Sequence, residues 1–384
     1  MKLAVVTYST RARGGVVHTL ALAEALAVLG VDVTVVSLAR GGDTGFFRAV
    51  DPRVTVSLVG FPDLEGETVG ERIVRSIAAL RDGIEWSEFD LVHAQDCISA
   101  NAVERCIRTI HHLDQFTTPE LIECHEKAIV RPFAHICVSN AVATEVEAGW
   151  GLHPTVIHNG VDSARFAAAA SSQPSAVASR FRWAHKVGAP YVLTVGGIEP
   201  RKGTLELVEA FAMVRADVPG LRLVVAGGET LFDYRSYRTL VDTRCIELGV
   251  EPLVLGPVHD DELPALVATA SVVAQTSTKE GFGMAAMEAL AAGVPVVLSD
   301  LPVFREVFGS VALFGARPDG LAAALARACA GVDTDRCDRG VALAAAHTWS
   351  AAAEAHLAFY EDCLDDEHRG PAATARISRR HPSS

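Results

Sequence analysis

The chain of 384 residues has no run of 18 or more apolar residues, so its sequence predicts no membrane-spanning helix. Its first residues, MKLAVVTYST, lack the long apolar stretch and the small-residue cleavage site of a signal peptide. The eight cysteines include no C-x-x-C pair, which argues against a zinc site and a disulfide framework. We therefore expect reduced thiols and a cytoplasmic protein, with contact at a membrane surface left open.

Positive charge is in short supply. The formal net charge is −13, which makes nucleic acid a poor partner, although a local cluster of cations can still bind an anionic ligand. Hydrophobic residues make up 49% of the chain and charged residues 21%, a balance typical of globular proteins. This length exceeds what one small core requires, so we expect two domains.

A dinucleotide-binding fingerprint is also missing. The sequence predicts a βαβ unit over residues 3–37, with Gly14 and Gly15 at the start of its helix. The helix begins with GGVVH, which is not G-x-G-x-x-G, and the second strand ends in SLAR, without the acid that binds a ribose hydroxyl. This argues against NAD, although the two glycines still form a flexible, anion-tolerant loop.

The most informative stretch is residues 272–300. It predicts a buried strand, a loop with the sequence EGFGM, a helix that opens near Gly283, and a second strand. A helix N-terminus offers unpaired N–H groups to a phosphate, and Gly281 and Gly283 let the backbone approach a ligand. In a continuous helix Glu280 and Glu288 would be roughly 12 Å apart, about the reach of one sugar nucleotide. One glutamate would then bind sugar hydroxyls and the other the ribose hydroxyls.

A second motif follows the strand predicted at Tyr191–Val195. The sequence GGIEPRKG stands between this strand and a helix predicted at Thr204–Val214. Arg201, Lys202 and the N–H groups of the helix can converge there on one anion. The sequence therefore predicts a clamp for a diphosphate.

Together these motifs resemble glycosyltransferase family 4, the retaining group 1 glycosyltransferases of the GT-B fold. The resemblance covers residues 1–363 and implies an α/β protein in which two Rossmann-like domains face a cleft. It also implies a C-terminal helix that crosses back to the first domain. The expected parts are an acceptor domain at 1–165, a mobile linker at 166–185, a donor domain at 186–350, the crossing helix at 351–363 and a disordered tail at 364–384.

The resemblance assigns roles to single residues. It implies that His111 and Glu280 are catalytic, with His112 as the alternative if that neighbour faces the cleft instead. It implies donor contacts for Gly15, Arg201, Lys202, Val258, Gly281, Phe282, Gly283, Met284 and Glu288. Gly197 stands where the family carries an arginine, so either Arg201 supplies the missing charge or the diphosphate is less neutralised. For His93 both a cleft-lining and a structural role stay open.

The activity implied is transfer of a sugar, with retention and without a metal or cofactor, from a nucleotide-diphosphate sugar to an acceptor hydroxyl. In the family's front-face mechanism the leaving phosphate takes the acceptor's proton. The acceptor is left open among small molecules, glycans and lipids. No D-x-D motif follows a strand at the cleft edge, and Lys279 is the only late lysine, which argues against a phosphorylase with pyridoxal phosphate. A sugar-nucleotide epimerase of this fold and a non-catalytic sensor remain the alternatives.

Overall fold

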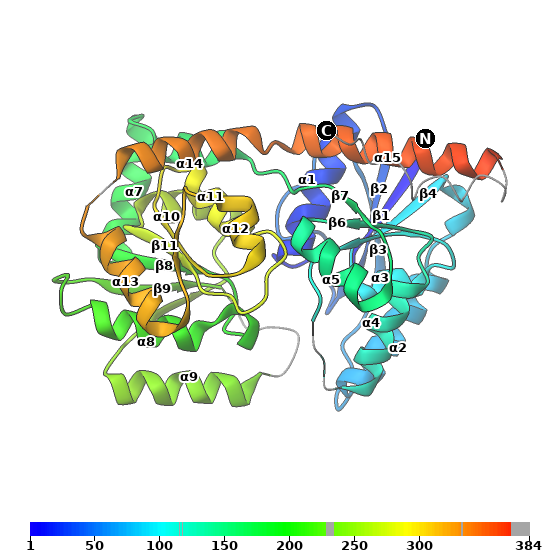
Figure 1. Ribbon diagram of the computed structural model, residues 1–384. Helices are drawn as coiled ribbons and strands as arrows, with labels where there is room; N and C mark the ends of the chain where they lie inside the picture. Colours follow the sequence, from blue (N-terminus) through cyan, green and yellow to red (C-terminus); the bar gives the residue numbers. More distant parts are fainter. Residues whose placement is uncertain (115, 117, 228–233, 332, 370–384) are drawn as a thin grey trace. The chain divides into compact units, whose positions relative to one another are not determined.

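The computed structural model describes residues 1–369 except 115, 117, 228–233 and 332 (Figure 1). The chain divides into two compact units, which are described separately here. Unit 1 comprises Met1–Gly160 and the segment that begins at Trp349, and unit 2 comprises Val161–Thr348. Each unit contains one parallel sheet covered by helices, so the expected α/β fold is confirmed.

The sheet of unit 1 has the strand order β3-β2-β1-β4-β5-β6-β7 within the described residues. Parallel strands with both faces covered read as continuous apolar runs. The first strand, KLAVV, fits this rule, because residues 3–6 are fully buried. The strands are β1 (Lys2–Val6), β2 (Asp32–Arg40), β3 (Thr55–Phe61), β4 (Leu91–Ala94), β5 (Ile107–Ile110), β6 (Ala134–Cys137) and β7 (Thr155–Val156).

Two groups of helices pack on this sheet. Helix α1 (Gly14–Val28) packs against α15 (Trp349–Arg369), which brings the chain's last described helix onto its first one (Figure 1). Tyr360 of α15 is fully buried in the same apolar core as Leu3 and Leu20. The other helices of unit 1 are α2 (Val69–Asp82), α3 (Cys97–Ala102), α4 (Pro119–Val130) and α5 (Asn140–Trp150), with a short 3-10 turn at Trp86–Glu88.

The sheet of unit 2 repeats this topology with the order β10-β9-β8-β11-β12-β13. In such a sheet successive strands are added first on one side of the first strand and then on its other side. Ligands bind beyond the carboxyl ends of the two neighbouring strands at which this strand order switches sides. In unit 2 these are β8 and β11. The strands are β8 (Tyr191–Val195), β9 (Arg222–Ala226), β10 (Leu253–Gly256), β11 (Val272–Gln275), β12 (Val296–Ser299) and β13 (Leu313–Gly315).

Helices cover the sheet of unit 2 in two packed groups. Helix α8 (Thr204–Val214) packs on α9 (Arg235–Leu248) and α13 (Arg317–Cys329). A second group consists of α6 (Ser163–Ala170), α7 (Pro174–Val187), α10 (Leu263–Thr269), α11 (Met284–Ala291) and α14 (Thr334–Ala346). The remaining helix is α12 (Pro302–Phe308), and short 3-10 turns lie at Pro200–Lys202 and Asp260–Glu262.

The segment expected to be a mobile linker is helical instead. Residues 166–185 lie mainly in α6 and α7, both of which pack against α10. Trp183 and Val187 of α7 are buried, which anchors this helix to unit 2. The composition suggested a connector because the stretch is rich in alanine and serine, but packing of a few large residues decides the outcome. Unit 2 consequently begins well before residue 186.

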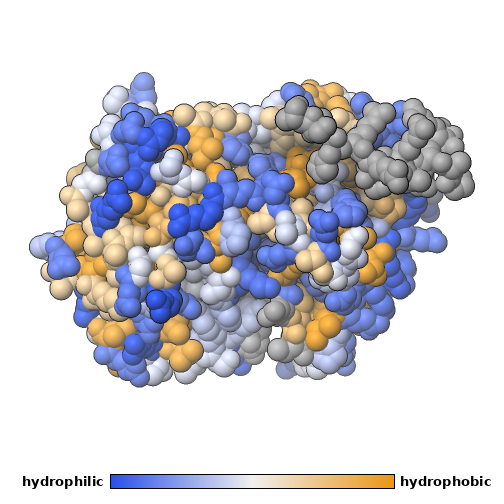
Figure 2. All heavy atoms as spheres, in the orientation of Figure 1, coloured by the Kyte–Doolittle hydropathy of each residue, from blue (hydrophilic) through white to orange (hydrophobic). Residues whose placement is uncertain are grey.

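The C-terminal helix is longer than expected. It begins at Trp349 and continues to Arg369, whereas the sequence suggested a helix over 351–363 and a disordered tail from 364. The rest of that tail, residues 370–384, lies outside the described residues. No helix within the described part of the chain is long and apolar enough to cross a membrane. Figure 2 shows apolar residues scattered among hydrophilic ones on the visible face, as is usual for protein surfaces.

Candidate active site

The loops that follow β8 and β11 lie side by side in unit 2, because the two strands are neighbours in the sheet. The Thr278 amide donates to the Arg201 carbonyl at 2.8 Å, and the Thr276 hydroxyl donates to the Gly203 carbonyl at 2.8 Å. Gly203 has φ +62°, and a Cβ there would lie 1.9 Å from the Thr276 carbonyl oxygen. Only glycine permits this approach. The two sequence motifs, almost 80 residues apart, therefore form one surface.

Lys202 and Glu280 meet at the centre of this surface. The Lys202 ammonium lies 2.9 Å from Oε2 of Glu280, and their side chains are only 18% and 13% exposed. Gln275 Nε2 donates to the same oxygen at 2.7 Å, and the Ser277 hydroxyl donates to it at 3.3 Å. A carboxylate with several donors is held in one orientation. Gln275 and Ser277 were not among the predicted site residues.

Helix α11 begins immediately after this carboxylate. Its N-cap is Gly283, with φ +98°, and no side chain caps the first turn. A Cβ at Gly283 would lie 2.9 Å from the rings of both Phe304 and Phe308. The N–H groups of the first turn, which includes Met284, therefore remain available to an anion. Gly281 and Phe282 are buried in the preceding loop.

Glu288 lies on α11, whereas Glu280 precedes the helix, so the continuous helix assumed for their separation is not present. Burial raises the pKa of Glu288 to about 8, with Arg165 opposing this shift and Asp260 and Asp162 adding to it. Arg165 is itself paired with Asp260 at 3.0 Å. No described residue hydrogen-bonds the Glu288 carboxyl group. Such a carboxyl group suits a ligand's hydroxyl pair.

The remaining donor-site candidates of unit 2 are less well placed. The guanidinium of Arg201 is paired with Glu199 at 3.1 Å, so part of its charge is already compensated. The loop after β10 contains Val258, which is half-buried. Because residue 197 is glycine, the loop after β8 lacks the arginine that the family carries there. The same loop is tightly packed, since a Cβ at Gly227 would lie 1.7 Å from the Gly196 carbonyl oxygen. The fold therefore brings Lys202, but not an unpaired Arg201, to Glu280.

Unit 1 places His111 just after β5. The imidazole Nε2 of His111 lies 3.1 Å from Gln95 Oε1, and its ring meets that of His18 edge-on, with centroids 4.8 Å apart. Burial, and then the positive charge of Arg108, lower the pKa of His111 well below its usual value. A Cβ at Gly15, in the first turn of α1, would lie 3.8 Å from this ring. Gly15 and His111 are thus neighbours, as the predicted roles require.

Two other histidines of unit 1 are placed differently. His112 is paired with Asp114 at 3.0 Å and does not share the contacts of His111. His93 is fully buried, and both its ring nitrogens have partners, Tyr360 at 2.7 Å and Thr109 at 2.6 Å. The structural role for His93 is therefore correct, and the cleft-lining role is wrong. Gln95 was not identified from the sequence alone. The signal was a shared alternation, because His93-Ala94-Gln95 and Thr109-Ile110-His111 both have polar residues on either side of an apolar one at the end of neighbouring strands.

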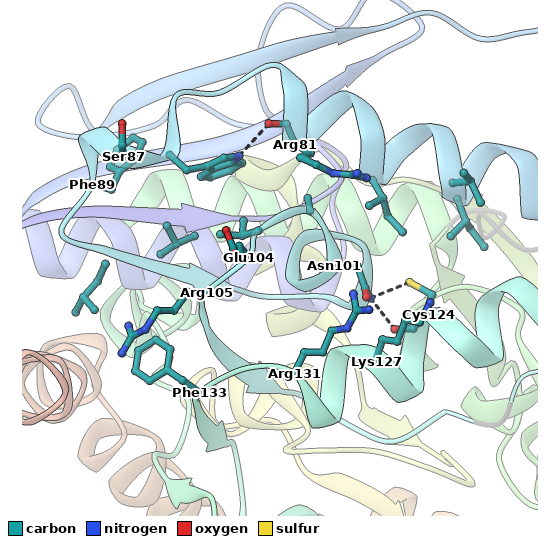
Figure 3. Close-up of a pocket in the computed structure, with 18 of the residues that line it drawn as sticks. Arg81, Ser87, Phe89, Asn101, Glu104, Arg105, Cys124, Lys127, Arg131 and Phe133 are labelled. Atoms are coloured by element: carbon teal, nitrogen blue, oxygen red, sulfur yellow. Dashed lines mark hydrogen bonds between the residues drawn. The ribbon is translucent and has the colours of Figure 1, made fainter. Parts of the chain in front are cut away.

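A groove of about 1080 Å³ lies elsewhere on unit 1 (Figure 3). Its lining includes Phe89 and Leu91 at the start of β4, and Arg105 stacked over Phe133 at 3.8 Å. It is therefore at the amino end of the strands, opposite the end that carries His111. Ligands of open parallel sheets bind at the carboxyl ends. We do not assign this groove to the active site. Among the described residues, no cluster of three metal-binding side chains occurs.

Comparisons with known proteins agree with this architecture. The model named "Glycosyltransferase Family 4" matches residues 12–165, and "Glycosyl transferases group 1" matches residues 177–330. A D-inositol 3-phosphate glycosyltransferase of Salinispora arenicola is 30% identical over 320 residues, covering 73% of this chain and 70% of the relative. A phosphatidyl-myo-inositol mannosyltransferase of Propionibacterium freudenreichii is 28% identical over 298 residues, covering 72% and 71%.

Solved structures share the fold. The sucrose-phosphate synthase of Thermosynechococcus elongatus superimposes with a TM-score of 0.76 at 19% identity, covering 95% of this chain and 99% of that one. The Anabaena protein HepE, solved in complex with UDP-glucose, gives a TM-score of 0.71 at 19% identity, with 94% and 100% covered. The two family models and the Salinispora relative place the chain in a family. The protein belongs to the group 1 glycosyltransferases of family 4 and has the GT-B fold.

Proposed function

We propose that this glycosyltransferase moves a sugar from a nucleoside diphosphate sugar to an acceptor hydroxyl, with retention at the anomeric carbon and without a metal ion. The observation that carries the proposal is the Lys202–Glu280 pair, 2.9 Å apart at the carboxyl ends of β8 and β11. A cation beside a carboxylate is suited to bind a ligand in which an anionic phosphate is joined to a sugar with hydroxyl groups. The ammonium suits the diphosphate, and the carboxylate suits sugar hydroxyls.

Two features of α11 support the donor's orientation. The uncapped first turn offers N–H groups and the positive end of the helix dipole to the diphosphate. Further along the same helix, Glu288 has a carboxyl group that no described residue hydrogen-bonds, and this group suits the ribose hydroxyls. Sugar, diphosphate and ribose would thus follow the order Glu280, first turn, Glu288. The base would lie near Val258.

The chemistry is a front-face substitution. The bond from the anomeric carbon to the diphosphate oxygen breaks, and a bond to the acceptor oxygen forms on the same face of the sugar. The acceptor's proton passes to the departing diphosphate. Negative charge accumulates on that leaving group, and Lys202 and the N–H groups of α11 stabilise it. For His111 of unit 1, the family resemblance supports the role of binding the donor sugar. Lys202 and the dipole of α11 supply the charge neutralisation for which other transferases use a divalent metal.

Donor turnover across a panel of UDP-, GDP- and ADP-sugars tests the proposal. Release of the nucleoside diphosphate, dependent on an added acceptor, identifies a transferase. Inositol and inositol phosphate are the first acceptors to try, because two relatives carry inositol in their names. Conversion of the donor into another sugar nucleotide would indicate an epimerase instead. Tight binding without any turnover would indicate a sensor.

Two further measurements decide the finer points. Proton NMR of the first-formed product reports the anomeric configuration, and inversion would contradict the proposed stereochemistry. Activity after exhaustive treatment with a chelator should remain within about twofold, since no step requires a metal. A chelator-sensitive rate restored by one divalent cation would contradict metal independence.

A further inference from the structure

Four polar side chains form a ladder on one face of the unit 1 sheet. Side chains two residues apart in extended chain share a face, so His93 of β4 aligns with Gln95 just after that strand, and Thr109 of β5 aligns with His111 just after that strand. These strands are paired neighbours. His93 Nε2 lies 2.6 Å from the Thr109 hydroxyl, and Gln95 Oε1 lies 3.1 Å from His111 Nε2. Gln95 Nε2 completes the ladder, 3.2 Å from His93 Nε2 and 3.4 Å from His93 Nδ1.

Helix α15 closes the far end of this ladder. The Tyr360 hydroxyl lies 2.7 Å from His93 Nδ1. His93, Thr109 and Tyr360 are fully buried, and Gln95 is 2% exposed. Water therefore cannot substitute for a missing partner, and each donor must find an acceptor inside the ladder. A residue close to the end of the chain is thereby connected to His111.

The contacts of His93 orient the Gln95 amide. The amide nitrogen lies 3.2 Å from His93 Nε2 and 3.4 Å from its Nδ1, so it stands over the face of the ring. An N–H is attracted to the electron-rich face of an aromatic ring, whereas an amide oxygen would be repelled. Tyr360 and Thr109 hold the ring itself through its two nitrogens.

The orientation of the Gln95 amide determines the tautomer of His111. Because His93 holds the amide nitrogen of Gln95, the amide oxygen faces His111 Nε2, and an oxygen of this kind can only accept. Nε2 of His111 therefore carries the proton, and Nδ1 carries the lone pair. Burial and the nearby Arg108 lower the pKa of His111, so the ring is neutral near pH 7. No described residue hydrogen-bonds Nδ1.

We propose that Tyr360, His93 and Gln95 are positioning residues that hold His111 as the Nε2–H tautomer, so that its Nδ1 accepts a hydrogen bond from a donor-sugar hydroxyl. This role in transfer depends on the proposed function. The tautomer itself does not, and it can be measured without any substrate. A histidine locked as an acceptor recognises a hydroxyl and disfavours an unprotonated phosphate oxygen at the same position.

The first test is the tautomer. Long-range proton–nitrogen NMR of protein with ¹⁵N-labelled histidine distinguishes protonated from lone-pair ring nitrogens, and His111→Gln assigns the signal. We expect a protonated Nε2 and a lone-pair Nδ1 at pH 7.5. A protonated Nδ1, or a charged ring, would overturn the assignment. This result holds whichever donor, if any, the protein turns over.

The second test perturbs the ladder from a distance. Tyr360→Phe removes the hydrogen-bond partner of His93 Nδ1, so the His93 ring and the Gln95 amide above it should reorganise and the His111 tautomer should change. We expect kcat to fall about tenfold with less than a twofold change in the acceptor's KM. Tyr191→Phe is the matched control, because it removes a buried tyrosine hydroxyl that donates to the Leu266 carbonyl in unit 2. An unchanged His111 signal and unchanged kcat in Tyr360→Phe would contradict the proposal.

Gln95→Glu provides a second variant with a distinct signature. A carboxylate accepts from His111 Nε2 and stabilises the charged form of that ring, so Nδ1 becomes a donor near neutral pH. Activity of Gln95→Glu should be low at pH 7 and should recover as the pH rises. The wild type should not show this rise in activity with pH. A merely structural role for Gln95 would lower activity equally at all pH values, and that outcome would refute the positioning role. If the wild type transfers no sugar while the tautomer is as assigned, the proposed function fails and the ladder stands.

Discussion

The ammonium of Lys202 and the carboxylate of Glu280 lie 2.9 Å apart, although 78 residues separate them in the sequence. Each group is mostly buried, and the carboxylate keeps two further donors, Gln275 and Ser277. The pair is therefore built into the unit 2 surface before any ligand arrives. A preorganised charge stabilises a transition state without reorganisation at the moment of reaction.

Lys202→Met should lower kcat by about 100-fold or more, because the leaving diphosphate loses its nearest cation. Stability should fall by only about 1–2 kcal/mol, since Glu280 retains its other donors. Glu280→Gln should also lower kcat, and the double variant should lose less than the sum of the two effects because the residues act together. Steady-state kinetics and urea unfolding measure both quantities. Lys279→Met, at a half-buried neighbouring lysine, is the control, and full activity in Lys202→Met would refute the assignment.

Gly15→Ala should separate activity from stability. Gly15 lies in the first turn of α1 without a positive φ, so alanine fits the backbone and should stabilise the fold by up to about 1 kcal/mol. The new methyl group would lie 3.8 Å from the His111 ring and occupy space beside it. We expect kcat/KM to fall at least about tenfold by donor titration. Gly14→Ala is the matched control, because a Cβ there meets nothing within 4 Å. Equal activity in both variants would contradict a donor contact at Gly15.

The sequence predicted the strands well because strands covered on both faces are continuous apolar runs, as in β1 and β11. It misjudged residues 166–185, because an alanine-rich stretch gives little periodic signal and two buried side chains, Trp183 and Val187, decide how α7 packs. Similarly, the tail expected from residue 364 begins as helix. Local composition describes solvation, whereas helix ends depend on what the helix packs against.

The site was predictable only in part. Motifs indicated Lys202 and Glu280 separately, but their contact depends on β8 and β11 being neighbours, which strand order alone decides. Gln95 carries no motif, and its role emerges only when β4 and β5 are paired. Arg201 was expected to join the clamp, yet Glu199 lies 3.1 Å from its guanidinium. A single sequence does not show which distant residues are in contact in the folded protein.

Acid should destabilise unit 1 through its buried histidines. His356 donates through Nδ1 to the Ala352 carbonyl at 2.7 Å, and its Nε2 is buried without a partner. Burial lowers the pKa of His356 to about 4, and it also lowers those of His18 and His93. The unfolded chain binds these protons first, so stability falls as the pH drops from about 6.5 through 4.

His356→Leu should reduce this acid sensitivity by up to about 1.4 kcal/mol per pH unit within that window. Urea unfolding followed at pH 4.5, 5.5 and 6.5 gives the slope. The control is His185→Leu, which removes an exposed histidine. The same slope in wild type and His356→Leu would show that this ring is not the group that titrates.

Glu288 should produce the opposite trend at higher pH. Burial raises its pKa to about 8 from an ordinary value near 4.5, so the folded protein retains a proton that the unfolded chain releases. Stability contributed by this group is present at low pH and is lost as the pH rises toward 8, with a slope of at most about 1.4 kcal/mol per pH unit. Above about pH 7.5 the buried histidines are mostly neutral in both states, because their ordinary pKa is near 6.5, so the slope between about pH 7.5 and 8 isolates the carboxyl group. Glu288→Gln should flatten the slope in urea unfolding, whereas Glu262→Gln, in an exposed turn, should leave it unchanged. A slope that persists in Glu288→Gln would mean that the carboxyl group is already ionised in the folded protein.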